Sequence, residues 1–260
     1  MRKIIKYSFY DLARSRWSYV YLMFYLLVGF LLLFLNAGLS NAIITLLNIV
    51  LILTPLIGTV FGVMYVYSSR EFTELLLAQP LKRSTIFLGQ YLGISISLSL
   101  SLFVGLGIPF VLYGLFQSAE IFNFLILLFA GVALTFIFVA ISFLISLKFD
   151  NKIKGFGLAI LAWLFLAIMY DGLFITFMVL FSDYPLEKYA LAATVFNPID
   201  LSRILILLKL DISALLGYTG AVFKSFLGNS YGMVISFLFL LLWVVLPLLF
   251  ITKTVNKKDF

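Results

Sequence analysis

Uncharged apolar runs of twenty residues and more constrain this chain more than any other feature of its sequence. A helix needs about 20 consecutive apolar residues to cross the hydrocarbon core of a bilayer. Because 64% of the residues are hydrophobic and 11% are charged, the chain has too few polar side chains to cover a soluble globule. A membrane β-barrel would require a series of short segments of alternating polarity, which the sequence lacks. The sequence therefore predicts an all-α integral membrane protein.

We expect six transmembrane helices within a single domain that covers residues 1–260. Their predicted ranges are 17–35, 42–67, 86–116, 121–147, 156–181 and 232–252. Cytoplasmic loops are rich in Lys and Arg, and a cytoplasmic N-terminus places all but four of the 18 basic residues on that side. Both termini are therefore predicted to be cytoplasmic, and the net charge of +7 reflects membrane orientation, with no nucleic-acid partner. The first apolar run exceeds the usual length of a cleaved signal peptide, and no A-x-A site follows it.

The residue types available to this chain exclude several kinds of chemistry. It contains no cysteine and no histidine, which excludes thiol redox chemistry, zinc sites and imidazole acid/base catalysis within the chain. Its methionines are scattered, so no thioether copper site is expected. We predict no catalytic residue, no metal ligand and no cofactor in this chain.

Asp171 is the only acid well inside a predicted span. An intramembrane carboxylate is a functional candidate, since burying it in hydrocarbon is costly. The alternative is a structural acid that accepts a hydrogen bond from a Tyr, a Ser or Asn48. No basic partner is apparent at its depth, and both interpretations stay open.

Two helical patterns lie outside the question of topology. Residues 1–16 alternate apolar and basic side chains at helical spacing, which is typical of an amphipathic helix at the cytoplasmic membrane surface; the alternative is a flexible basic leader.

In the third span, small residues recur every four positions and allow close helix approach. They are Gly89, Gly93, Ser97, Ser101 and Gly105. This ridge can pack within the subunit or across a dimer.

The segment 182–231 is the only sizeable extracytoplasmic piece. Within it, "FNPIDLSRILILLKL" begins as helices do, with Asn197 as N-cap, Pro198 in the first helical position and Asp200 in the first turn. About twelve residues cannot span a bilayer, so we expect this helix at the outer interface or against another protein. A seventh and an eighth crossing would require this piece and "ISALLGYTGAVFKSFLG" both to insert.

A charged stretch, "SSREFTELLLAQPLKRSTIFLG" (68–89), separates the second and third spans. Ser68 and Glu71 have the spacing of a capping box, which predicts the start of a new helix. One face of that helix would carry Phe72, Leu75, Leu76 and Gln79, with Glu71 and Glu74 on the rest of its surface. Pro80 would end the helix, and Lys82 and Arg83 lie where the chain returns to the membrane. A short helix of this kind, 68–80, is suited to docking in a groove of a partner.

This stretch resembles the signature of the permease subunits of type 2 ABC transporters: an acidic exit, a Leu-rich turn, a Gln-Pro break, a basic pair and a Gly-rich return, "FLGQYLG". The resemblance covers the whole chain. It implies that this loop is the coupling helix that contacts a nucleotide-binding subunit. It assigns that contact to Glu71, Phe72, Glu74, Leu75, Leu76, Gln79, Pro80 and Arg83. The chain itself lacks a G-x-x-x-x-G-K-[ST] loop, so ATP and Mg²⁺ would be bound by a separate ATPase.

A narrower resemblance rests on "FNPIDLSRILILL" and the intramembrane "MYDG", which are similar to segments of the permeases that serve nitrous oxide reductase maturation. It implies a mechanical role in assembling a copper–sulfur centre, with Asn197, Pro198, Asp200 and Arg203 docking a periplasmic partner. The implied partners are two ATPase subunits, a second copy of this chain, a periplasmic β-helical protein, a copper chaperone and membrane lipids, at the bacterial inner membrane.

Three alternatives remain open from the sequence. A generic type 2 ABC exporter of lipid, drug or polysaccharide fits the coupling helix equally well. A membrane-embedded enzyme would need a polar constellation, and Asp171, Asn48 and Gln90 are all that the spans offer. A scaffold or insertase would lack an ATPase partner.

Overall fold

The computed structural model describes residues 1–35, 38–181, 187–210 and 217–257, and within these ranges the chain is helical and contains no strand. The prediction of an all-α membrane protein is confirmed, because six helices are long and apolar enough to cross a membrane. They are α2 (Arg16–Leu35), α3 (Leu39–Ser68), α5 (Arg83–Leu112), α6 (Ile121–Lys148), the continuous helix of α7 (Lys152–Leu164), η2 (Phe165–Met169) and α8 (Tyr170–Leu180), and the part of α11 (Gly217–Lys257) from Tyr231 onward.

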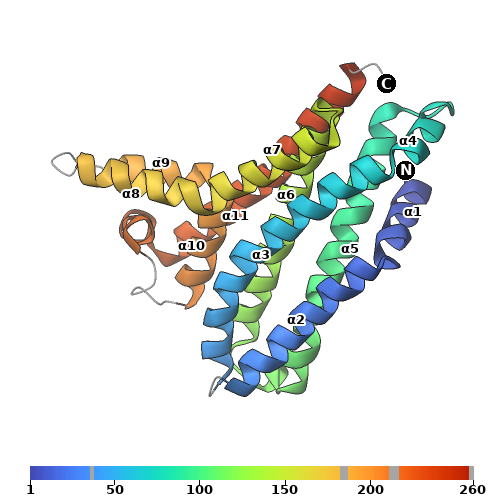
Figure 1. The fold of residues 1–260 in the computed structure, drawn as a ribbon. Coiled ribbons are helices and arrows are strands. Elements are labelled where there is room, and N and C mark those ends of the chain that lie inside the picture. Colours follow the sequence, from blue (N-terminus) through green and yellow to red (C-terminus); the bar gives the residue numbers. More distant parts are fainter. Residues whose placement is uncertain (36–37, 182–186, 211–216, 258–260) are drawn as a thin grey trace.

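The shorter elements connect these spans. They are α1 (Arg2–Ala13), α4 (Arg70–Leu77), the single turn η1 (Leu115–Gln117), α9 (Glu187–Phe196) and α10 (Pro198–Leu210). Both chain ends and α4 gather at one end of the molecule, as expected for an even number of crossings (Figure 1).

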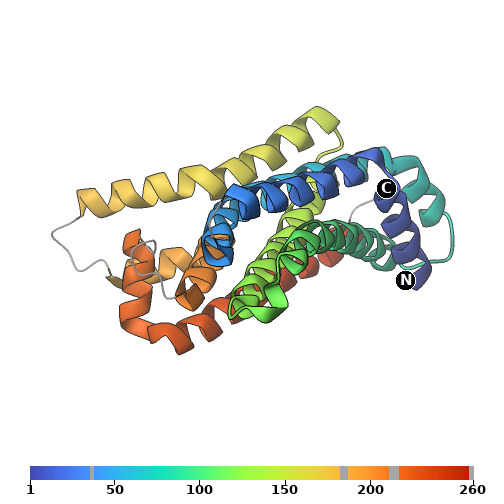
Figure 2. The ribbon, with the colours of Figure 1, turned by 90° about the horizontal axis from the view of Figure 1, so that it is seen from below.

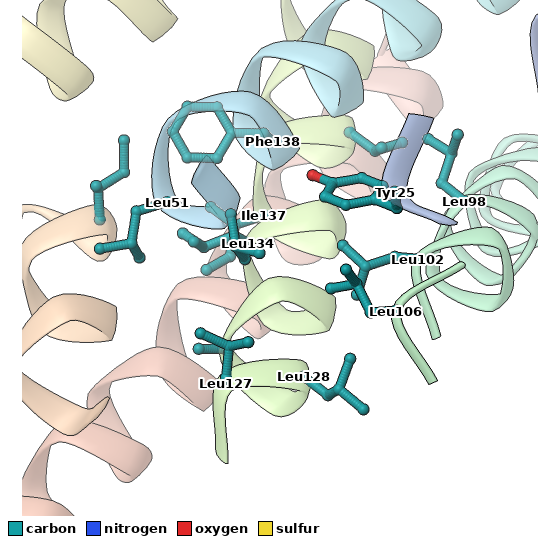
Figure 3. Close-up of a cluster of buried hydrophobic side chains, with 14 of the residues drawn as sticks. Tyr25, Leu51, Leu98, Leu102, Leu106, Leu127, Leu128, Leu134, Ile137 and Phe138 are labelled. Carbon is teal, nitrogen blue, oxygen red and sulfur yellow. The ribbon is translucent and has the colours of Figure 1, made fainter. Parts of the chain in front are cut away.

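Helices α2, α3, α5 and α6 form a bundle, in which α3 and α6 make the most extensive contact (Figure 1). Leucines of α5 and α6 meet Tyr25 and Leu51 in its core, as Figure 3 shows. Polar groups near the centre of such a core must satisfy each other, and the hydroxyls of Tyr25 and Thr54 lie 2.7 Å apart. Dense packing of this kind holds helices together in a bilayer, where lipid is as apolar as leucine.

The small-residue ridge of α5 packs within the chain, because α1 and α2 lie on it. A Cβ added at Gly93 would lie 2.7 Å from the Cβ of Ser8 and 2.8 Å from the backbone oxygen of Ile5. Farther along the ridge, the hydroxyls of Ser18 and Ser101 are 3.3 Å apart. Helix α1 therefore packs as an ordered helix against the bundle, and the flexible-leader alternative is wrong.

The fifth span departs from the bundle. Helix α7 packs on α3 and α6, but beyond Leu164 neither η2 nor α8 buries a residue (Figure 1). In Figure 2 the α8 end of this long helix extends along one side of the molecule, away from α6 and α11. The five residues of η2 form a π-helical turn, wider than an α-helical one, at the point of departure.

Helices α9 and α10 both pack against α11, and α10 also packs against α6 and α3. Ten of the thirteen residues of α10 are buried, including Ile199, Leu201 and Ile206. Its length forbids a crossing, as the sequence predicts. The helix is expected at the outer interface or against another protein, and its apolar side chains are covered by other helices of the same chain.

Helix α11 is continuous apart from a sharp bend at Gly228, whose φ of 67° is readily adopted by glycine. The bend precedes the sixth span. Of the rest of the predicted outer segment, residues 182–186 and 211–216 lie outside the described residues.

Candidate functional site

Helix α4 joins α3 to α5 at the end of the bundle where both termini lie (Figure 1). The predicted capping box is wrong. Helix α3 continues through Ser68, and Ser69 is the N-cap of α4 without a side-chain capping bond. Both serine hydroxyls instead donate to the backbone carbonyl of Tyr65, at 3.2 Å and 2.7 Å. Serine hydroxyls can bond back to the preceding turn in this way, and here they complete the end of α3.

The inner face of α4 is fastened to two neighbouring helices. The amide of Gln90 on α5 donates to the buried hydroxyl of Thr73 at 2.8 Å. The ring of Phe72 stacks on Tyr7 of α1, with centroids 4.3 Å apart. A hydrogen bond and a ring stack at different points of one short helix restrain its rotation. A displacement of α4 would therefore be passed to both α5 and α1.

The outer face of α4 is exposed. On it and just beyond it lie the predicted contact residues Glu71, Glu74, Leu75, Gln79, Pro80 and Arg83. Phe72 and Leu76 are partly buried, so the predicted common face of Phe72, Leu75, Leu76 and Gln79 is divided between the inner and outer sides. Leu75 is 69% exposed and stands beside Glu74, which pairs with Arg70 at 3.1 Å.

A second group of predicted residues comes together where α8 meets α10. The guanidinium Nη1 of Arg203 lies 3.1 Å from Asp171 Oδ2 and 3.1 Å from Asp200 Oδ1. One cation thus bridges carboxylates from two helices. The prediction that Asp171 lacks a basic partner is wrong, and no Tyr, Ser or Asn48 side chain takes that place in the described contacts.

Asn197 connects this cluster to the backbone of η2. Its side-chain amide donates to the carbonyl of Leu166 at 2.9 Å and to Asp200 Oδ2 at 3.0 Å. Its carbonyl oxygen accepts from the backbone N–H of Ile199 at 3.1 Å, which confirms the predicted N-cap, with Pro198 next in the helix. One buried asparagine therefore begins α10 and ties it to the π-helical turn.

The end of α9 is held from two sides. Tyr170 donates to the carbonyl of Ala193 at 2.7 Å, and the indole of Trp243 donates to the carbonyl of Val195 at 2.9 Å. Carbonyls in the last turn of a helix lack partners within it, and a proline soon after prevents its continuation. The two aromatic donors satisfy these carbonyls.

The electrostatics of the cluster favour a proton on Asp200. Burial and the adjacent Asp171 carboxylate raise the pKa of Asp200 to about 7, while Arg203 and the amide of Asn197 act in the opposite direction. Two carboxylates facing one guanidinium leave one negative charge in excess, which favours the protonated form of Asp200 more than in an isolated carboxyl group.

The two sites are built from different elements: α4 with α1 and α5 in one, and η2, α8 and α10 in the other. Within the described ranges, no three His, Cys, Asp or Glu side chains gather closely enough to hold a metal ion. What sequence reasoning missed is the pairing of Arg203 with Asp171. The i,i+3 spacing of Asp200 and Arg203 was a visible sign that this arginine had an acidic environment.

Similarity to a known protein extends over most of the chain. No family model matches the chain. The probable ABC transporter permease protein NosY of Stutzerimonas stutzeri is 24% identical to it over 226 residues, which cover 81% of this chain and 78% of that protein. Together with six apolar helices, this similarity supports a multi-pass membrane protein. It also supports a place for the chain among the permease subunits of ABC transporters.

Proposed function

We propose that this chain is the membrane subunit through which ATP hydrolysis by a separate ATPase drives transport or a mechanical signal across the bilayer. The observation that carries this proposal is the arrangement of α4. It presents Leu75 and two carboxylates outward at the end of the bundle, while its inner face is fastened to α1 and α5. The similarity to an ABC permease supports an ATPase as the occupant of that outer face.

The proposed coupling follows the contacts of α4. An ATPase that closes on ATP pulls or pushes Leu75 and Glu74, the outward residues. Gln90 and Tyr7 receive the displacement through Thr73 and Phe72. Since α5 is the most buried of the six spans after α6 and contacts α2, α3 and α6, a shift of α5 reaches the rest of the bundle. Such a switch requires the ATPase to contact α4 differently in its two nucleotide states.

The finer proposal is a role in maturing the copper–sulfur centre of nitrous oxide reductase. It rests on the resemblance of "MYDG" and "FNPIDLSRILILL" to that group of permeases. The structure adds that these two segments touch, because Arg203 of one pairs with Asp171 of the other. Without histidine or cysteine, and with its methionines scattered along the sequence, the chain offers no clustered copper ligands, so copper would be held by partner proteins. A periplasmic β-helical protein, a copper chaperone, a second copy of the chain and cytoplasmic termini belong to this proposal.

A generic exporter is the second candidate, and one observation favours it. Asn197, Pro198 and Asp200 are buried within the chain, which leaves Arg203 as the accessible member of the predicted docking group. A periplasmic partner would then have to bind around Arg203 or displace α10. An exporter needs no such contact.

The test is purification of the tagged full-length chain from its native membranes, followed by mass spectrometry and an ATPase assay of the purified complex. We expect an ATPase to co-purify, and Leu75→Ala to reduce its retention about tenfold, as for truncation of an interface anchor. We expect Glu74→Lys to weaken it similarly by reversing a charge at the contact. Co-purification of a periplasmic β-helical protein would favour the maturation role over the exporter.

The matched control is Leu112→Ala. Leu112 is 71% exposed, close to the 69% of Leu75, but it lies at the opposite end of α5 from α4. It should leave ATPase retention unchanged. Equal retention by the Leu75, Glu74 and Leu112 variants, or the absence of any ATPase, would exclude α4 as the coupling site.

A further inference from the structure

An open groove runs between the end of α6 and the length of α7, with a volume of about 610 Å³. Volumes of about 300–1,000 Å³ are usual for small-molecule sites. One side of the groove is a single helical face of α7 and η2, made by Leu158, Leu161, Phe165 and Met169. Leucine and isoleucine of α6, with the phenylalanine that follows it, form the other wall. The groove is independent of α4 and of the Arg203 cluster.

Its polarity is confined to one end. Lys148, the last residue of α6, is exposed and lines the groove where α6 turns into α7. The first turn of α7 adds Lys152 and Lys154, both exposed, against the single acid Asp150 in the same turn of chain. The groove is thus apolar along its length and positively charged at the α4 end.

The length of the apolar part matches one half of a bilayer. Leu158 and Met169 are eleven positions apart, which corresponds to about 16 Å along a helix. One leaflet contributes about half of the roughly 30 Å hydrocarbon core. A ligand with an apolar tail of leaflet depth and an anionic group at its end fits both the dimension and the charge.

We propose that this groove binds one anionic phospholipid from the leaflet at the α4 end, with its acyl chain along α7 and its phosphate at Lys148. Basic pockets between transmembrane helices are suited to such head groups. A second copy of the chain is a less suitable occupant, because an apolar helix face would leave Lys148 without a counter-charge. The proposal does not depend on the ATPase partner, so it stands or fails separately from the function proposed above.

The experiment is native mass spectrometry of the purified full-length chain, titrated with phosphatidylglycerol or with phosphatidylcholine of the same acyl chains. We expect one phosphatidylglycerol per chain to be retained in preference to phosphatidylcholine. Lys148→Ala should weaken that binding about fivefold, the change typical of one basic residue at a membrane surface. Lys152→Ala is the matched control, since Lys152 carries the same charge four residues on but does not line the groove.

A second variant tests the apolar part. Ala162 lines the groove, and Ala162→Phe should fill it and abolish retention of the bound phosphatidylglycerol. Equal losses from Lys148→Ala and Lys152→Ala would indicate diffuse charge attraction and overturn the proposal. Unchanged phosphatidylglycerol binding in Ala162→Phe, or equal retention of the two lipids by the wild type, would also overturn it. The same holds if Ala162→Phe dissociates a dimer while lipid binding persists.

Discussion

Helix α6 and the α7–η2–α8 helix are nearly equal in length, at 28 and 29 residues, and both are strongly apolar. Yet 67% of the most apolar part of α6 is buried inside the molecule, against 6% for α7–η2–α8. Apolar length alone predicts a crossing and says nothing about how a span packs.

Small side chains mark the places where both helices pack closely. Along α6, Thr135 and Ser142 face glycines of α3, and a Cβ at Gly62 would lie only 2.8 Å from the Cβ of Ser142. In α7 the buried residues are Gly155 and Ala159, near its start, and small residues permit such close approach in membranes. Ala167 and Gly172 farther along the fifth span are not buried, so small residues alone do not determine where this span packs.

The fifth span is therefore positioned by polar contacts. Along it, Trp163 donates to the carbonyl of Ile52 at 3.2 Å, Leu166 accepts from Asn197 and Asp171 pairs with Arg203. Polar contacts between membrane helices contribute about 0.6 kcal/mol on average. A substitution in the bundle should therefore lower the stability of the whole bundle, whereas a substitution at a contact of α8 should destabilise only α8 and its neighbours.

The largest expected effect lies in the bundle. Gly93→Ala places a Cβ 2.7 Å from Ser8 and 2.8 Å from a backbone oxygen, so α1 must shift, at a cost of about 1–3 kcal/mol of unfolding free energy. Gly107→Ala, on the same helix but with nothing within 4 Å of its added Cβ, should stabilise by up to about 1 kcal/mol. Equilibrium unfolding in detergent measures both, and equal effects would refute close packing of α1 on α5.

The next effect concerns the ion pairs of the fifth span. Arg203→Met leaves two partly buried carboxylates without their cation and should weaken the α8–α10 contact by about 1–2 kcal/mol, since a third of each partner of the Asp171 pair is exposed. Hydrogen exchange should accelerate in α8 and α10 and remain unchanged in α3 and α6. Adding Asp200→Asn should recover part of the loss by removing one of the two carboxylates. Equal acceleration in the bundle would contradict the distinction between the two regions.

The stability of the same contact is expected to depend on pH. Because the pKa of Asp200 is raised in the folded protein, the unfolded chain loses this proton first, and stability falls as the pH rises from about 4 to the folded value of about 7. Exchange protection of α10 should therefore decline between about pH 4 and pH 7. Asp200→Asn should abolish that decline, and a decline that persists in the variant would have another origin.

The smallest effect tests a single hydrogen bond. Trp163→Phe removes the indole donor to Ile52 and keeps most of the apolar surface, so we expect a loss of about 0.6 kcal/mol, confined to exchange in α7. Trp243→Phe, which removes the donor to Val195, provides a comparison on α11. A loss in either variant above that of Arg203→Met would show that single hydrogen bonds outweigh the ion pairs in positioning the fifth span.

Sequence reasoning succeeded where a signal was local. Apolar run lengths located six spans, and Asn197 followed by Pro198 located the start of α10. It failed where the deciding contact was distant in the chain. Asp171 and Arg203 are 32 residues apart on different helices, and nothing in either segment shows that they meet.

The burial of α10 was missed for a related reason. A helix of thirteen residues is too short to cross a bilayer, which led to the expectation of the outer interface or another protein as its surroundings. A short apolar helix can also be covered by other helices of its own chain, as α10 is. The capping box failed because α3 continues through Ser68, so that Ser69 is the N-cap of α4 and the hydroxyl of Ser68 donates to the carbonyl of Tyr65.

The π-helical turn η2 sets the rotational phase of α8. Successive residues of an α-helix are about 100° apart around its axis, so one residue more or fewer in this turn rotates everything that follows by about that angle. Deleting Ala167 would keep α8 just as long and just as apolar, yet would direct Asp171 away from Arg203 and Tyr170 away from Ala193. The number of residues in this one wide turn therefore determines which way the side chains of α8 point. Insertions or deletions in η2 should be far less tolerated than substitutions that retain apolar character.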